Sequence, residues 1–145
     1  MKRRRRKRLT RRLFAAIIQG DALRVRAALR AGAGPRWADA EGTTALYEAA
    51  VSGRTAIVRL LLEAGAPPDA ESHGVGADGT PLCAAACWGF TETVRELLAH
   101  GADPNLREEG GAGRSPLDWA DRGPHPETAA LLTSAGAVRQ DVSFP

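Results

Sequence analysis

The chain has 145 residues, of which 43% are hydrophobic and 5% aromatic, and its formal net charge is +3. This length suits one domain, and the composition suits an aliphatic, Ala-rich core. No apolar run approaches the roughly 18–20 residues of a membrane-spanning helix, and with two cysteines and no convincing export signal we expect a reducing, cytoplasmic location.

The first twelve residues are a strongly basic arm, and we expect this arm, residues 1–12, to be disordered. Nine of the 20 basic residues lie there without an acid, which leaves 11 basic against 17 acidic residues in the rest of the chain. All eleven are Arg, an excess that is typical of GC-rich bacterial genomes, so we expect a bacterial origin. A single isoelectric point hides this division into a basic arm and an acidic body.

The function of the arm stays open at this stage. A run of cations binds phosphates without reading sequence, or an anionic membrane surface, and the seven consecutive candidates are Lys2, Arg3, Arg4, Arg5, Arg6, Lys7 and Arg8. No aromatic residue is interleaved among them for base stacking, which disfavours specific recognition of single strands. The alternatives are a solvated tail, an arm that folds back on the acidic body, or a start-site artefact.

After the arm, the chain repeats itself. Gly-Ala pairs begin at positions 32, 65, 101 and 136, and a second glycine series lies at positions 20, 53 and 89. An apolar helical segment lies between the two series each time. A fixed period of this length indicates a stacked array of small units, which offers an extended surface rather than a built-in active-site cleft.

Each unit predicts two short helices. In the unit that starts near Asp39, Thr44 is a suitable N-cap for the first helix, and Gly53 ends that helix, where a left-handed residue is needed. An apolar stripe then predicts the second helix, with Ile57, Val58, Leu61 and Leu62 on one face. Pro67 and Pro68 stop it.

The residues of these units resemble the ankyrin repeat family. The strongest matches are Thr80-Pro81-Leu82 with Ala85-Ala86, and Gly101-Ala102-Asp103-Pro104-Asn105. The resemblance covers residues 13–138 and implies an all-α, ankyrin-type solenoid of about four stacked helix-turn-helix repeats with projecting hairpin loops. We place the repeats at about 13–38, 39–74, 75–109 and 110–138, followed by a C-terminal tail, 139–145.

The chain departs from the family pattern at several places. Tyr47, Cys83 and Asp118 replace the histidine that usually opens the first helix, so the family's hydrogen-bond network between repeats is not expected. The loop 71–77 carries about three extra residues and the loop 108–113 about two. The first unit lacks the opening turn motif and the last unit has polar residues beside Leu131-Leu132, so both ends resemble caps. We therefore expect a complete array, and we also expect a monomer.

The sequence contains only weak candidates for a catalytic, metal-binding or phosphate-binding site. Cys83 and Cys87 lie at i and i+4 on one predicted helix, which we interpret as packing, with a reactive thiol or a metal pair as alternatives. His73, His100 and His125 have no common neighbour, and no glycine-rich segment leads from a strand into a phosphate-binding helix. We therefore expect no enzyme activity, no metal, no cofactor and no small-molecule substrate.

The candidate function is binding of another protein. The family resemblance assigns this role to the concave face, and exposed aromatic and Arg side chains are typical interface anchors. The predicted partner-binding residues are Glu41, Thr43, Val51, Ser52, Cys87, Trp88, Arg107, Arg114 and Arg122. The alternative is an adaptor that contacts nucleic acid or an anionic membrane through the basic arm.

Overall fold

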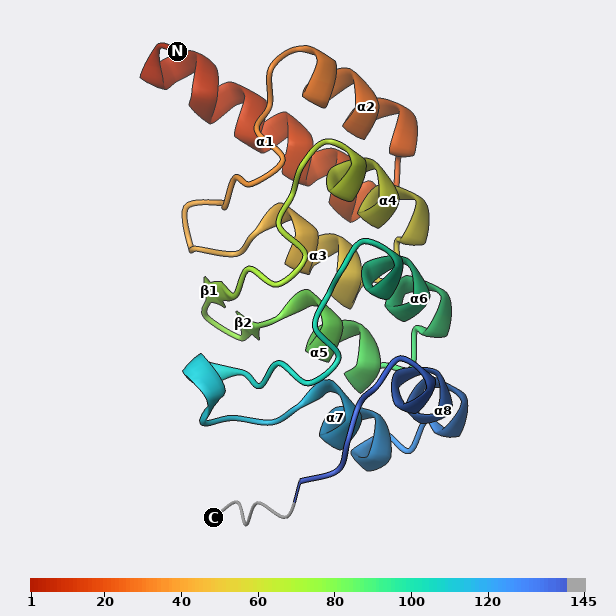
Figure 1. The fold of residues 1–145 in the computed structure, drawn as a ribbon. Helices are drawn as coiled ribbons and strands as arrows, with labels where there is room; N and C mark the ends of the chain where they lie inside the picture. The colour runs from red at the N-terminus through yellow and green to blue at the C-terminus, as the bar shows by residue number, and fades with distance from the viewer. Residues whose placement is uncertain (141–145) are drawn as a thin grey trace.

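The computed structural model describes residues 1–140 as a stack of helix pairs (Figure 1). The elements in chain order are α1 (Arg3–Gln19), α2 (Ala22–Arg30), α3 (Ala45–Val51), α4 (Thr55–Glu63), β1 (Ser72–Gly74), β2 (Ala77–Gly79), α5 (Pro81–Cys87), α6 (Thr91–Ala99), a 3-10 turn (Glu109–Gly111), α7 (Pro116–Arg122) and α8 (Pro126–Ser134). Four helix pairs agree with the predicted solenoid of about four units.

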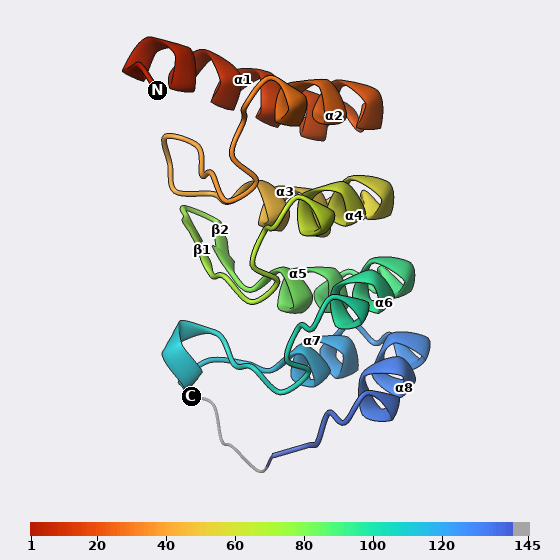
Figure 2. The same cartoon turned by 45° about the horizontal axis from the view of Figure 1, so that its top comes forward.

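The helices form two layers (Figure 2). The inner layer holds α1, α3, α5 and α7, each packed on the next, and the outer layer holds α2, α4, α6 and α8 in the same order. Three loops project from the inner layer to the same side, and we call them the finger loops: residues 31–44, 67–79 and 103–115. The core lies between the layers, and its fully buried side chains are mostly Leu, Ile and Val.

The inner helices begin at side-chain caps, as predicted for Thr44. The hydroxyl of Thr44 accepts a hydrogen bond from the Tyr47 amide at 3.1 Å, and Thr80 does the same for Cys83. Ser115 caps α7 with a reciprocal bond from its own amide to Asp118. Such caps satisfy amides that have no partner within the helix, which fixes where each inner helix starts.

The end of each outer helix explains the Gly-Ala period. Gly65 follows α4 with a φ of 103°, a backbone conformation that residues other than glycine rarely adopt. The turn lets the next residue, Ala66, donate its amide to the Leu61 carbonyl at 2.9 Å and become buried. The same bond recurs at Ala33, Ala102 and Ala137.

The prediction of an all-α fold is wrong in one detail. Strands β1 and β2 form a two-stranded antiparallel hairpin in the second finger loop, with His73 paired to Asp78. The hairpin uses the extra residues that the sequence showed in the loop 71–77. Val75 and Gly76 form its two-residue turn, where Gly76 has a φ of 70°. The insertion is long enough to close a ladder, which a shorter loop cannot do.

The prediction of a disordered arm at residues 1–12 is also wrong. Arg3–Gln19 forms a single helix, so most of the arm belongs to the first inner helix. Leu9 and Leu13 are almost completely buried and anchor its middle. Arg5 donates to the Ala31 carbonyl at 3.2 Å, and the Arg6 guanidinium lies 5.1 Å from the centre of the Trp37 ring. These contacts hold a charged segment in helical form.

The predicted tail, 139–145, lies largely outside the described residues, which end at 140. Arg139 pairs with Asp121 at 3.0 Å, and the Gln140 side chain accepts from Arg107 at 3.0 Å. None of the helices in the described part of the chain is long and apolar enough to cross a membrane.

Candidate functional site

The ends of the inner helices form one continuous row. Val51 and Ser52 lie at the end of α3, Cys87 and Trp88 at the end of α5, and Arg122 at the end of α7. Because α3, α5 and α7 pack side by side in that order, these positions are neighbours from repeat to repeat. We call them the end row. The structure therefore brings together five of the nine predicted partner-binding residues.

Trp88 is the most prominent side chain of the end row. It is 61% exposed, although a tryptophan is usually well covered in a folded domain. Ser52 and Arg122 are also exposed, while Val51 and Cys87 are partly covered. An exposed Trp next to Arg offers the large, rigid contact area that anchors protein interfaces.

Trp119 supports the arginines beside the end row. The guanidinium of Arg122 lies 6.0 Å from the centre of the Trp119 ring, and that of Arg114 lies 5.5 Å from it. Both distances permit cation–π attraction. The ring thus lies beside two predicted partner-binding residues, Arg122 from α7 and Arg114 from the third finger loop.

Two predicted partner-binding residues are not on the accessible surface. Thr43 is only 4% exposed, because the next finger loop packs on it: the His73 amide donates to the Gly42 carbonyl at 3.1 Å, and Gly74 lies against the Thr43 hydroxyl. Of this first finger loop, Glu41 remains exposed, as predicted.

Arg107 is the second of these buried residues, at 8% exposed. Its guanidinium donates to the Gly113 carbonyl at 2.9 Å and lies 3.5 Å from the Asp118 carboxylate. Its contacts therefore join the third finger loop to the start of α7. Arg107 has a structural role, and the position of a charge in a loop is not enough to show that it is exposed.

Glu108 is a residue that the sequence analysis missed. Its carboxylate lies partly buried beside Cys83 and Trp119, and burial raises the pKa of that carboxyl despite the contact with the Trp119 indole. Nearby Asp78 raises it further. The sequence marks this position only indirectly, because Glu108 begins the loop 108–113 with its two extra residues. The inward direction of its side chain appears only in the folded loop.

The cysteines have the environment of packing residues. Cys83 is 1% exposed and its thiol lies 3.7 Å from the Arg114 carbonyl oxygen. Burial raises the pKa of both thiols, that of Cys83 strongly. A raised pKa favours the protonated, less nucleophilic form. Residues 1–140 contain no group of three or more His, Cys, Asp or Glu side chains that could hold a metal ion.

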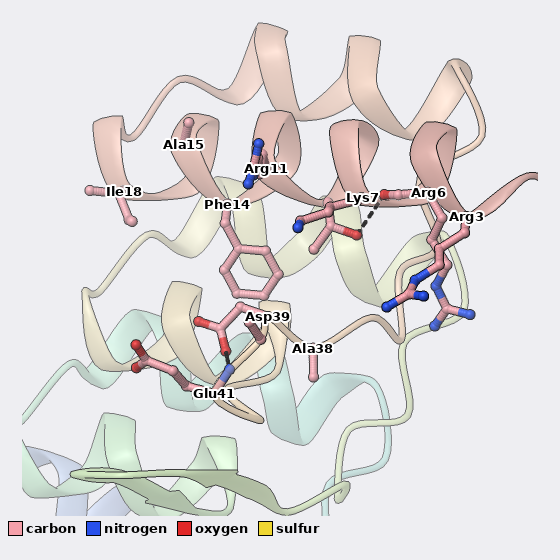
Figure 3. A pocket seen from close by; sticks show the side chains of 12 residues that line it. Arg3, Arg6, Lys7, Arg11, Phe14, Ala15, Ile18, Ala38, Asp39 and Glu41 are labelled. Carbon is pink, nitrogen blue, oxygen red and sulfur yellow. Dashed lines mark hydrogen bonds between the residues drawn. The ribbon is translucent and has the colours of Figure 1, made fainter.

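A second candidate region is the groove between α1 and the first finger loop (Figure 3). It has a volume of about 860 Å³ and is lined by basic residues of α1, by Phe14 and Ile18, and by the loop residues 38–41. The predicted cationic residues Lys2 to Arg8 are all exposed, and within the described chain none of them forms an ion pair with a carboxylate. Sequence analysis found these cations but not the groove.

The two-layered stack and its finger loops are those of a helical-repeat solenoid. Comparison with known proteins agrees, because residues 41–73 and 79–109 match the ankyrin repeat family. A similar protein is the human "Ankyrin repeat domain-containing protein 39", 38% identical over 61 residues, which are 42% of this chain and 33% of that protein. The expected bacterial origin stays a prediction.

The matches and the helix pairs together fit an ankyrin-type solenoid. Ankyrin repeats are in general protein–protein interaction modules and are typically non-catalytic. The matched segment spans only a third of the length of the human relative, so the activity and partners of that protein are not assigned to this chain.

Proposed function

We propose that this protein is a non-catalytic interaction module that binds a partner protein through the end row and the adjacent finger loops. The observation that carries the proposal is Trp88, which is 61% exposed at the end of α5, in line with Val51, Ser52 and Arg122. In the free protein this large apolar side chain is exposed to water. Its burial against a partner would lower the free energy and so favour binding.

The surrounding geometry supports the same surface. Arg122 and Arg114 are held against Trp119, so little side-chain freedom is lost when a partner binds them. The end row lies on helices of a packed array, which keeps the anchors at fixed spacing. In our proposal the protein acts in the cytoplasm as a monomer and takes no small-molecule substrate.

A site-specific crosslinking experiment tests this placement. A photo-reactive amino acid replaces Ser52 in the full chain, and a matched protein carries it at Leu23, which is 77% exposed on the outer helix α2. We expect a stoichiometric partner to crosslink at position 52 and not at position 23. We then expect Trp88→Ala and Arg122→Ala to weaken binding of that partner by about tenfold or more each.

Leu23→Ala is the matched control, because it also removes an exposed apolar side chain but from the other layer. It should leave the affinity unchanged. If Trp88→Ala and Arg122→Ala both bound the partner as tightly as the unmodified chain, the end row would not be the binding surface.

Contact with nucleic acid or an anionic membrane through Lys2–Arg8 is the second candidate function. The observation that favours it is the run of exposed cations without carboxylate partners in residues 1–140. Such binding releases counterions, so its affinity must fall steeply as salt rises. Affinity for a mixed-sequence oligonucleotide that does not change with salt would exclude it.

A further inference from the structure

The groove between α1 and the first finger loop has walls of opposite charge (Figure 3). The wall formed by α1 carries four cations, and these are Arg3, Arg6, Lys7 and Arg11. The loop wall carries Asp39 and Glu41, but Asp39 is already engaged, because its carboxylate accepts the amides of Glu41 at 2.9 Å and Thr43 at 3.0 Å. A ligand in the groove therefore meets an excess of positive charge.

The end of the groove beyond the cations is apolar. The Phe14 ring lies between the helix and the loop in Figure 3 and is 8% exposed, and Ile18, further along α1, is 61% exposed. Exposed apolar surface next to a row of cations favours a ligand that carries both acidic and apolar groups. A phosphodiester chain has no aliphatic side chain to cover Ile18, whereas a peptide segment can supply one.

The helix that carries these cations is formed before any ligand arrives. Leu9 and Leu13 fix it to the core, and the Arg6 guanidinium lies 5.1 Å from the centre of the Trp37 ring. The Thr10 hydroxyl donates to the Arg6 carbonyl at 2.8 Å. Binding to cations on a formed helix costs less conformational entropy than binding to a disordered arm.

The same cations crowd one another. Arg3, Lys7 and Arg11 follow at i, i+4 and i+8 on one face of α1, and like charges at this spacing destabilise a helix. The first turn of α1 contains no acidic residue, so the positive end of the helix dipole is also uncompensated. Carboxylates placed along the groove relieve both repulsions.

From these observations we propose that the groove binds a short, extended acidic segment of a partner protein, with a large apolar side chain at one end of its carboxylates. The α1 wall from Arg3 to Ile18 measures about 22 Å at the rise of an α-helix, enough for an extended segment of about seven residues. The inference rests on the proposed protein-binding function, but it uses residues other than Trp88 and Arg122.

A purified-component experiment tests the proposal without a known partner. The probe is a fluorescein-labelled peptide of about eight residues with a run of Glu and Leu-Phe at one end, and its binding to the full chain is followed by fluorescence anisotropy. Two double variants have the same net charge. Arg3→Glu/Lys7→Glu changes the groove wall, whereas Arg4→Glu/Arg8→Glu changes cations that do not line the groove.

We expect Arg3→Glu/Lys7→Glu to weaken peptide binding about tenfold or more, and Arg4→Glu/Arg8→Glu to weaken it about threefold or less. Ile18→Ser should also weaken it, and replacing the Leu-Phe of the probe by Ser-Ser should do the same. Circular dichroism of each variant verifies that α1 is still helical, which acidic residues in its first turns favour.

Equal weakening by the two double variants would overturn the proposal, because it would mean that the probe senses only net charge. The proposal would also be overturned if an oligothymidylate, or vesicles containing phosphatidylserine, bound more tightly than the peptide and were weakened equally by the two double variants. Trp88→Ala measured with the same probe should have no effect. The end-row proposal is judged by its own crosslinking experiment, so either proposal can fail alone.

Discussion

Glu108 shows how a single side chain links the third finger loop to the inner layer. Its carboxyl contacts Cys83 and Trp119, and burial raises its pKa above the ordinary value. The charge of Glu108 in turn raises the pKa values of Cys83, Cys87 and Tyr47, and for Tyr47, where burial is the main cause, the pKa rises to about 12. One carboxylate therefore influences the whole cluster between two repeats.

The raised pKa of Glu108 predicts a stability that falls as pH rises. In the window from the ordinary pKa of Glu up to the raised value, the folded state holds more protons than the unfolded state, so deprotonation favours unfolding. Glu108→Gln removes the partly buried charge, and we expect it to raise the free energy of unfolding at pH 7. Urea denaturation between pH 4 and pH 8 measures this.

Glu109→Gln is the control for this prediction, because Glu109 is the exposed neighbour in the same turn. Its charge is the smallest of the causes that raise the pKa of Glu108, so Glu109→Gln should change the stability and its slope with pH much less than Glu108→Gln does. The cause assigned to Glu108 is wrong if Glu108→Gln leaves the pH slope of the unmodified protein intact.

At the scale of elements, the outer helices are joined by hydroxyl pairs near their first turns. Thr55 of α4 lies 2.8 Å from Thr93 of α6, oxygen to oxygen, and Thr91 of α6 lies 2.9 Å from Thr128 of α8. Thr93 and Thr128 are each only 1% exposed. These pairs repeat in register, so a polar contact is placed where each outer helix meets the next.

The hydroxyl pairs predict strong non-additivity. Thr55→Val leaves the buried Thr93 hydroxyl without its partner, and we expect a loss of about 1–2 kcal/mol in the free energy of unfolding. The double change Thr55→Val/Thr93→Val replaces both partners by apolar groups of the same shape and should recover most of that loss. A double-mutant cycle in urea gives the coupling energy.

Thr133→Val provides a matched comparison, because the Thr133 hydroxyl bonds only to the Ala129 carbonyl of its own helix. We expect that substitution to have little effect. Simple addition of the two single losses in the Thr55 and Thr93 double variant would show that the pair carries no coupling.

At the scale of the whole molecule, the stack makes stability depend on position along the array. Leu97 of α6 and Leu132 of α8 are both fully buried. Helix α6 packs mainly on α4, α5 and α8, whereas α8 packs mainly on α6 and α7. In a solenoid each repeat is stabilised by its neighbours, so a terminal repeat has less support than a central one.

This difference predicts two patterns of hydrogen exchange. Leu97→Ala and Leu132→Ala each remove about 2–5 kcal/mol of core packing. We expect Leu97→Ala to speed amide exchange throughout α3 to α8, and Leu132→Ala to speed it mainly in α7 and α8. An equal loss of protection in α3 and α4 for both variants would show that the array unfolds as one unit.

The sequence by itself determined the number of repeats, the pairing of helices and the turn chemistry. The Gly-Ala period, the Thr44 cap and the stripe of α4 act within one turn or one helix, so local rules predict them. It also predicted that Trp88 and Arg122 lie at helix ends, because of their register against the glycines, and their role in binding stays a prediction. Thr43 and Arg107 were assigned wrongly to the accessible surface.

Only the tertiary structure decided the features that depend on contacts between repeats. Helix formation at the arm follows from burial of Leu9 and Leu13 and from the Arg6–Trp37 contact, which outweigh a charge pattern typical of a solvated tail. Burial of Thr43 depends on the hairpin of the next finger loop, and the groove exists only between α1 and the loop 38–41. Such contacts join segments that are far apart in the chain, so the pattern of residues within one segment cannot predict them.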